Sequence, residues 1–205
     1  MILDGHLNKN KVENMKIIEL NKDQIVNIYN KMMVHDFPKN ELRPLEWILK
    51  PYDEGTYICY ALQDGEAGAN EVLGYAFFVK MNNHYLFDYF AITERQRNNG
   101  LGSVFLKLIK EKFACCDSVI GEVEDPQCSS NEEERLKQTR RFDFYIKNGY
   151  LDTGVRVNLF GVDYIVLEAD LGTSHSKEEI SLLYQEHYKS MLSKKLYEKM
   201  VRIKC

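Results

Sequence analysis

The sequence predicts a mixed α/β fold in which a central sheet is flanked by helices and followed by a C-terminal helix. Three observations support this prediction. Apolar runs typical of strands alternate along the chain with segments whose apolar residues keep a helical period. A buried strand ending at Ile92 runs through a glycine-containing turn into a helix. A long apolar stripe at helical spacing fills the last thirty or so residues.

The N-terminal half carries the signals of a strand, two helices and three further strands. Asn21 followed by Gln24 predicts a capping box at the start of the first helix, and the pair Phe37-Pro38 predicts its end. Pro51 predicts the end of a short second helix. In order, we expect a strand over 15–20, a helix over 21–37, a short helix over 45–49, and strands over 56–62, 72–81 and 84–92.

The C-terminal half predicts a helix, a strand, a helix, a hairpin and a last helix. Either Ser130 with Glu133 or Asn131 with Glu134 predicts a capping box for the second helix of this half. In order, we expect a helix over 101–113, a strand over 118–123, a helix over 131–147, strands over 150–157 and 163–169, and a helix from Ser176 to about Val201. We expect the stripe of that last helix to pack on the parent domain, with a dimer contact as the alternative.

The turn before the helix over 101–113 indicates a ligand. Gly100 and Gly102 lie where the first helical turn begins. The first N–H groups of a helix have no intrahelical partner, and glycines let a phosphate approach the backbone at the positive end of the helix dipole. The pattern therefore predicts a nucleotide-type ligand. It matches neither a Walker A loop nor the Gly-x-Gly-x-x-Gly loop of dinucleotide-binding folds.

This turn reads Arg97-Asn98-Asn99-Gly100-Leu101-Gly102, and here the sequence resembles the GNAT superfamily of acetyl-CoA-dependent N-acetyltransferases, whose signature is Arg/Gln-x-x-Gly-x-Gly/Ala. A second match supports the first, because Tyr145, Gly149 and Tyr150 fit the Tyr-x-x-x-Gly-Phe/Tyr motif of the family. The resemblance covers residues 15–171. It departs from the family at Gln138, where Asn is common, so we assign no cofactor contact to Gln138.

The resemblance implies a mixed, mostly antiparallel sheet whose two central strands splay apart to admit the pantetheine arm of acetyl-CoA. It implies that main-chain groups of Phe90, Ala91 and Ile92 bind that arm, although these side chains fit a plain core as well. It also implies that a run of residues holds the pyrophosphate, mainly through N–H groups, namely Arg97, Asn98, Asn99, Gly100, Leu101, Gly102 and Ser103. Tyr145 aligns with the tyrosine that donates a proton to the CoA sulfur, and its alternative role is core packing.

Acetyl transfer to an amine also needs a group that removes the amine's proton. Three carboxylates are candidates: Asp88, Glu122 and Glu124. Asp88 and Glu122 interrupt apolar strands, and a buried carboxylate must be paired or functional. The equally weighted alternative is that one of them forms an ion pair with Arg140 or Arg141.

The resemblance also implies where the acceptor is recognised, namely in the segment over 37–44 and the loop before Asp163. Glu41 could hold a cationic amine or be solvated. We expect a primary amine on a small molecule as the acceptor. The alternatives are a peptide or protein amine, a CoA-binding module without acetyl transfer, and a scaffold for protein contacts. We expect a monomer or a homodimer.

Composition excludes several other classes of protein. The 205 residues carry a net charge of −4 and a pI of about 5.8, which argues against nucleic-acid binding. We find no apolar run that would span a membrane and no signal-peptide core, so we expect no membrane partner and a cytoplasmic location. Five cysteines without a Cys-x2-Cys pair, and histidines without metal spacing, predict reduced thiols and no metal. We expect a disordered extension over 1–14, an acetyltransferase domain over 15–172 and a helical extension over 173–205.

Overall fold

The computed structural model describes residues 14–39, 41–65 and 71–204. Within these residues the strands form one 8-stranded sheet in the order β1-β2-β3-β4-β5-β7-β6-β8. The sheet is mostly antiparallel, with a parallel pair between β4 and β5, and helices flank it. The predicted fold class is therefore confirmed. The predicted disordered extension lies outside the described residues, apart from Asn14.

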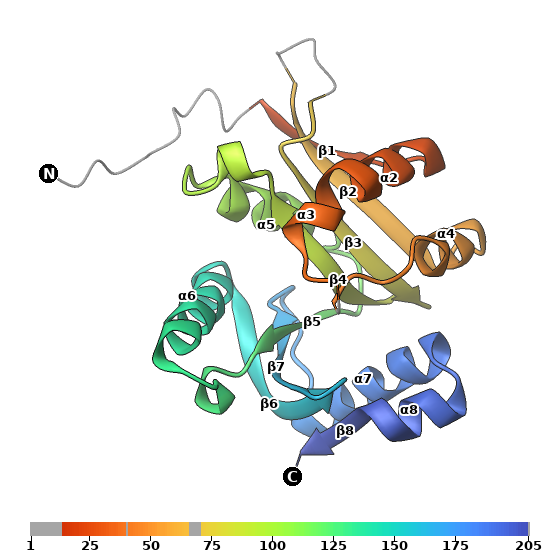
Figure 1. Cartoon of the computed structure of the whole chain (residues 1–205), viewed down its shortest axis with the longest axis vertical. Coiled ribbons are helices and arrows are strands. Elements are labelled where there is room, and N and C mark those ends of the chain that lie inside the picture. The colour runs from red at the N-terminus through yellow and green to blue at the C-terminus, as the bar shows by residue number, and fades with distance from the viewer. Residues whose placement is uncertain (1–13, 40, 66–70, 205) are drawn as a thin grey trace, which may run out of the picture. The chain divides into compact units, whose positions relative to one another are not determined.

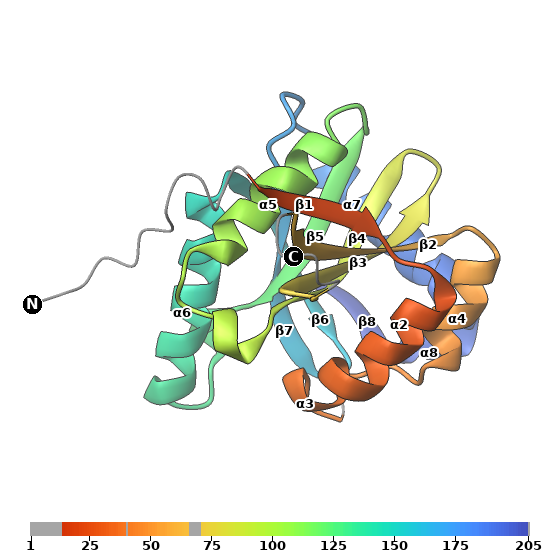
Figure 2. The same cartoon turned by 90° about the horizontal axis from the view of Figure 1, so that it is seen from above.

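The chain divides into two compact units, and β4 contributes to both. The first unit comprises the described residues up to Lys80 together with Asp88–Lys112. Its elements are β1 (Met15–Glu19), α2 (Lys22–Ile28), the π-helical turn η1 (Tyr29–Met33), α3 (Val34–Asp36), α4 (Glu46–Asp53), β2 (Tyr57–Asp64), β3 (Gly74–Met81), the end of β4 (His84–Ile92), the turn η2 (Glu94–Gln96) and α5 (Leu101–Lys112). Helix α5 lies on one side of strands β1–β3, and α2 and α4 lie on the other (Figures 1 and 2).

Local signals explain most of these boundaries. The capping box at the start of α2 is confirmed in both directions, between Asn21 and Gln24. The predicted end of α4 before Pro51 is wrong, because the helix continues to Asp53. Proline removes one N–H donor, but the next turn still closes through the N–H of Glu54, 3.1 Å from the carbonyl of Lys50. The loss of one hydrogen bond therefore does not end this helix.

The second unit comprises Met81–Phe87 and the described residues from Phe113 onward. Its further elements are β5 (Ser118–Glu124), the turn η3 (Pro126–Cys128), α6 (Glu132–Lys147), β6 (Tyr150–Leu159), β7 (Val162–Ala169), α7 (Lys177–Met191), α8 (Lys194–Met200) and β8 (Val201–Lys204). Figure 1 shows α6 and α7 on opposite sides of β5, β7 and β6. The hairpin between β6 and β7 is as predicted, and its two turn residues, Phe160 and Gly161, both have positive φ.

The C-terminal segment differs from the single helix that the sequence predicts. Leu192 adopts an extended conformation that ends α7, and Ser193 caps a new helix by accepting a hydrogen bond from the N–H of Leu196. The chain then forms β8, which pairs antiparallel with β6. Four residues of α7 are buried, namely Ile180, Tyr184, His187 and Tyr188, and the first three belong to the apolar stripe of the sequence.

Candidate functional site

The turn that the sequence analysis expects to bind phosphate contains two left-handed residues directly before a helix. Asn98 and Gly100 both adopt left-handed conformations, with φ of 63° and 77°, which asparagine and glycine tolerate best. Helix α5 starts directly afterwards, and the N–H of Ser103 closes its first turn 3.1 Å from the carbonyl of Gly100. When left-handed residues precede the first turn of a helix, successive N–H groups can point toward one place. Such a place favours an anion.

Arg97 anchors this turn to α3. One guanidinium nitrogen lies 2.6 Å from Asp36, and Nε donates to the carbonyl of Ile92 at 3.0 Å. Asp36 also accepts a hydrogen bond of 2.8 Å from Tyr75, whose pKa is raised by burial and by this carboxylate. The structure therefore gives Arg97 a structural contact that the sequence analysis missed, because Asp36 lies far from it in the chain.

The end of β4 supplies the residues expected to meet the pantetheine arm. Strand β4 pairs with β5 over His84–Phe87 and runs on past this paired stretch to Ile92. The ring of Phe90 packs 5.5 Å from that of Phe105 of α5, centroid to centroid. On β3, a Cβ added at Gly74 would lie 2.8 Å from the carbonyl oxygen of Ala91. Glycine at that position therefore permits the close approach of β3 to this part of β4.

Asp88 is buried and paired with residues that the sequence analysis did not nominate. Its side chain is 7% exposed and lies 2.9 Å from a guanidinium nitrogen of Arg43, and its second carboxylate oxygen accepts a short hydrogen bond from Tyr57. Burial, followed by the charge of Asp88, raises the pKa of Tyr57 well above its ordinary value. An ion pair for a candidate carboxylate was the alternative expectation, but the partner is Arg43 rather than Arg140 or Arg141.

Arg43 belongs to the segment expected to recognise the acceptor, and tyrosines fix its backbone. Its N–H donates to the hydroxyl of Tyr89 at 2.9 Å, and its carbonyl accepts from Tyr29 at 2.8 Å. The hydroxyl of Tyr89 donates in turn to the carbonyl of Glu41. The described part of this segment is therefore tied to β4 and η1. Asn40 lies outside the described residues.

In the second unit, β5 presents the other two candidate carboxylates in different environments. Glu124 forms an ion pair with Arg141 of α6, as the alternative interpretation anticipated. Glu122 accepts a hydrogen bond of 2.7 Å from the hydroxyl of Tyr188 of α7. Protonating Glu124 would forfeit its ion pair, whereas Glu122 contacts a neutral phenol. No sequence motif pointed to Tyr188, which lies on α7 far from Glu122 in the chain.

Tyr145, the predicted proton donor, lies on α6. Its ring packs edge-on against Tyr150, with centroids 5.4 Å apart. Burial raises the pKa of Tyr145 to about 12, against a smaller opposing effect of Arg141. Its phenol therefore keeps its proton at neutral pH. Two turns earlier on the helix, the side-chain oxygen of Gln138 is buried without a hydrogen-bond partner among the described residues.

The described part of the chain shows no sign of a membrane span or of a metal centre. No helix there is both long and apolar enough to cross a membrane. The same residues include no group of three or more histidine, cysteine, aspartate or glutamate side chains placed to hold a metal ion.

The family of the chain follows from a comparison with family models. The model of the acetyltransferase (GNAT) family matches residues 22–130, which is more than half of the 205 residues. The chain therefore belongs to the GNAT acetyltransferase family, as the two sequence motifs indicated. A comparison with curated protein sequences found no significant match.

Solved structures with the same fold include several acetyltransferases. A GNAT-family protein from Bacteroides thetaiotaomicron is 17% identical, with a TM-score of 0.64 over 86% of this chain and 98% of that one. The ribosomal-protein-S18-alanine N-acetyltransferase of Escherichia coli is 14% identical, with a TM-score of 0.56 over 78% and 96%. The spermidine N-acetyltransferase of Vibrio cholerae, solved with CoA and spermine, is 12% identical, with a TM-score of 0.56 over 76% and 95%. At these identities the likeness shows the fold alone.

Proposed function

We propose that this GNAT acetyltransferase transfers the acetyl group of acetyl-CoA to a primary amine, on a small molecule, by direct attack in a ternary complex. The observation that carries the proposal is the turn over 97–103, where left-handed Asn98 and Gly100 lead into α5. That geometry suits a pyrophosphate. Because β4 runs past its paired stretch with β5, the main-chain groups of Phe90, Ala91 and Ile92 are the backbone proposed to meet the pantetheine arm.

Within the turn we propose two kinds of role. The N–H groups of Asn98, Asn99, Gly100, Leu101 and Gly102 face the pyrophosphate, and the hydroxyl of Ser103 adds a donor. Arg97 holds the turn against Asp36 with an ion pair of 2.6 Å. Its charge also favours an anion nearby, because a guanidinium that is 47% exposed interacts with more than one partner.

The proposed reaction moves two protons. The neutral amine attacks the thioester carbonyl carbon, the new C–N bond forms, the C–S bond breaks, and CoA leaves as a thiolate. Tyr145 donates its phenolic proton to that sulfur, and its raised pKa of about 12 keeps the phenol protonated before the reaction. Glu122 accepts the proton that the amine nitrogen loses, directly or through water. Exchange with solvent returns both side chains to their starting states.

Among the three candidate carboxylates we propose Glu122 for this step because of their contacts. Asp88 and Glu124 each contact an arginine, and accepting a proton would forfeit those ion pairs. We therefore assign Asp88 a positioning role toward Arg43, and Glu124 a positioning role toward Arg141. Glu122 accepts its hydrogen bond from a neutral donor, so a proton costs it less.

A thiol-release assay with a panel of amines tests the proposal. The panel contains spermidine, free amino acids and a peptide with an N-terminal alanine, because the similar folds include enzymes named for a polyamine and for a ribosomal-protein alanine. We expect turnover with at least one small amine, lowered about 10²-fold or more but still measurable in Glu122→Gln, and kept in Tyr197→Phe, a variant of a tyrosine on α8. Turnover with the peptide alone would assign a peptide substrate. Binding of acetyl-CoA without turnover would assign a binding module.

Three expectations about the whole protein remain predictions. We propose a cytoplasmic protein that binds no nucleic acid, on the acidic composition and the cysteine pattern. We propose a monomer or a homodimer. We also propose that residues 15–172 act as the acetyltransferase domain and 173–205 as its extension.

A further inference from the structure

Helix α7 places two buried tyrosines against the side of the sheet that carries Glu122. Tyr188 is 2% exposed, Tyr184 is fully buried, and their rings lie 4.8 Å apart. Residues four apart on a helix lie on the same face, so both phenols point the same way. The hydroxyl of Tyr188 donates to Glu122 at 2.7 Å. Burial, followed by the charge of Glu122, raises the pKa of Tyr184 well above its ordinary value. The phenol of Tyr184 therefore stays in its neutral, proton-bearing form.

This contact distinguishes Tyr188 from His187 on the same helix, whose ring nitrogens are buried without a hydrogen-bond partner among the described residues. A helix that only filled the core would present an apolar group at position 188, as Ile180 does two turns earlier. A buried phenol instead needs a hydrogen-bond partner, and an ionised carboxylate is the stronger acceptor. The hydroxyl of Tyr188 thus favours the charged form of Glu122 and fixes where its oxygens point. A carboxylate that removes a proton from an amine needs both properties.

We propose that α7, which belongs to the C-terminal extension, is part of the catalytic apparatus, with Tyr188 as a positioning residue that holds the Glu122 carboxylate ionised and oriented for proton removal. The inference rests on the proposed function, in which Glu122 accepts the amine's proton. The ring of Tyr184 packs against that of Tyr188, with centroids 4.8 Å apart, and supports it. The extension would then be required for the reaction as well as for stability.

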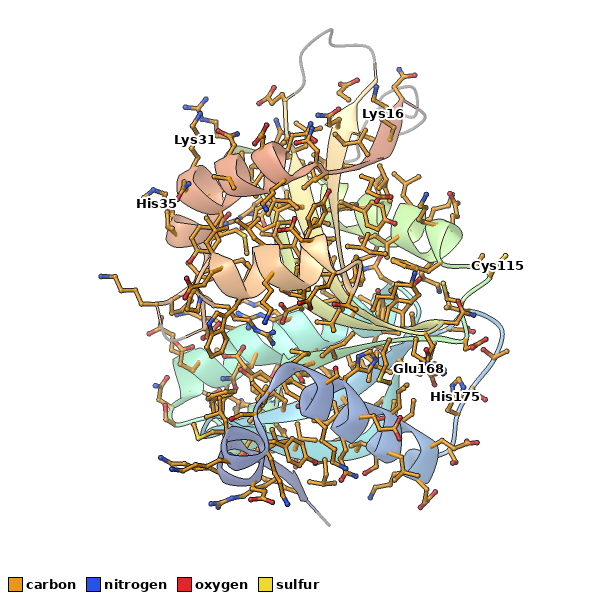
Figure 3. The ribbon with its side chains drawn as sticks, turned by 90° about the vertical axis from the view of Figure 1, so that its right-hand side faces the viewer. Lys16, Lys31, His35, Cys115, Glu168 and His175 are labelled. Carbon is orange, nitrogen blue, oxygen red and sulfur yellow. The ribbon has the colours of Figure 1, made fainter. Side chains whose placement is uncertain are left out.

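Other titratable groups near this side of the sheet are already engaged. Glu168 of β7 is held by His175, whose N–H and Nδ1 lie 3.3 and 2.5 Å from it, and Figure 3 shows the two side chains together. Directly opposite Glu122 on β7 is Val166, which does not titrate. Burial, with the charge of His84 added, lowers the pKa of His187 to about 4, so that ring is neutral at pH 7.

Glu124, on the same strand as Glu122, completes the set of neighbouring charges. It is neutralised by Arg141 of α6. A change in the pH dependence on removal of the hydroxyl of Tyr188 would therefore report on the contact with Glu122.

The test is the pH profile of kcat/KM for the full-length protein with the best amine of the panel. Removing a donor from an ionised carboxylate raises the pH at which it takes up a proton. In Tyr188→Phe we expect the acid limb of the profile to move up by about one pH unit. Tyr197→Phe removes a phenol that donates to Gln185 instead, and should leave the limb in place.

Two further variants keep the inference testable if Tyr188→Phe folds poorly. Glu122→Gln should remove the acid limb, and adding Tyr188→Phe to it should change nothing more. Replacing Tyr188 by 3-fluorotyrosine makes the phenol a stronger donor and should move the limb down. If the acid limb of Tyr188→Phe lay at the same pH as in the wild type, and only the melting temperature were lower, the inference would be overturned. No acetyl transfer by the wild type would instead overturn the proposed function.

Discussion

The ion pair between Arg43 and Asp88 should contribute strongly to stability, and Arg43→Met measures its contribution. The methionine keeps the apolar stem but leaves the Asp88 carboxylate, which is 7% exposed, without its counter-charge. Breaking a buried pair by removing one partner costs about 3–5 kcal/mol. We expect the lower end, about 3 kcal/mol, because Arg43 is itself 22% exposed.

Urea unfolding provides the assay, and a second ion pair in the same unit provides the control. Lys22 and Asp53 lie 2.6 Å apart but are 49% and 52% exposed. Lys22→Met should therefore cost less than about 1 kcal/mol. The double variant Arg43→Met with Asp88→Asn should be more stable than the sum of its single changes implies, by about 2 kcal/mol, because it no longer buries a lone charge.

Equal losses of stability in Arg43→Met and Lys22→Met would refute this reasoning. Asp88 would then not depend on Arg43, and its assignment as a positioning residue would fail. A loss of turnover in Asp88→Asn, with unfolding unchanged, would return Asp88 to the set of candidate proton acceptors.

The remaining predictions concern a histidine and the proton donor. Burial, and to a lesser extent the charge of His84, lowers the pKa of His187 from 6.5 to about 4. Between these two pH values the unfolded chain therefore binds a proton at His187 that the folded chain does not bind. Stability should fall by about 3 kcal/mol as the pH drops from 6.5 toward 4. Urea unfolding at several pH values between 6.5 and 4 measures this loss of stability. The loss should be smaller in His187→Gln and unchanged in His35→Gln, a control at an exposed position. Tyr145→Phe should lower kcat by about 10²-fold or more. Tyr150→Phe, which removes a neighbouring hydroxyl, should change kcat little, and equal losses would contradict the donor role.

Elements with local signals could be predicted from the sequence. Capping boxes begin α2, between Asn21 and Gln24, and α7, between Ser176 and Glu179, and in each the two partners lie three residues apart. The turn at Phe160-Gly161 and the turn before α5 are likewise contained in a few neighbouring residues. Such signals act before any tertiary contact exists, so they can be recognised from a short window of sequence.

Features that depend on distant partners could not be predicted. Strand β8 forms because Val201 and Ile203 pair with the free edge of β6. The apolar residues just before β8 keep a helical spacing, so the sequence pattern predicts a continuous helix there instead. The contacts of Asp88 with Arg43, and of Glu122 with Tyr188, join residues far apart in the chain. The alternation of a strand shows that a carboxylate is misplaced among apolar neighbours, but not which partner compensates it.

The central claim is that the turn over 97–103 binds acetyl-CoA, and calorimetric titration tests it most directly. Gly100 and Gly55 have similar left-handed conformations, with φ of 77° and 73°, and a Cβ at Gly55 would meet nothing within 4 Å. Valine at either position strains the backbone by about 1–2 kcal/mol, but only Gly100→Val obstructs the turn. We predict that the wild type and Gly55→Val bind alike and that Gly100→Val binds about tenfold more weakly or worse. No binding by the wild type, or equal binding by all three, would contradict the account.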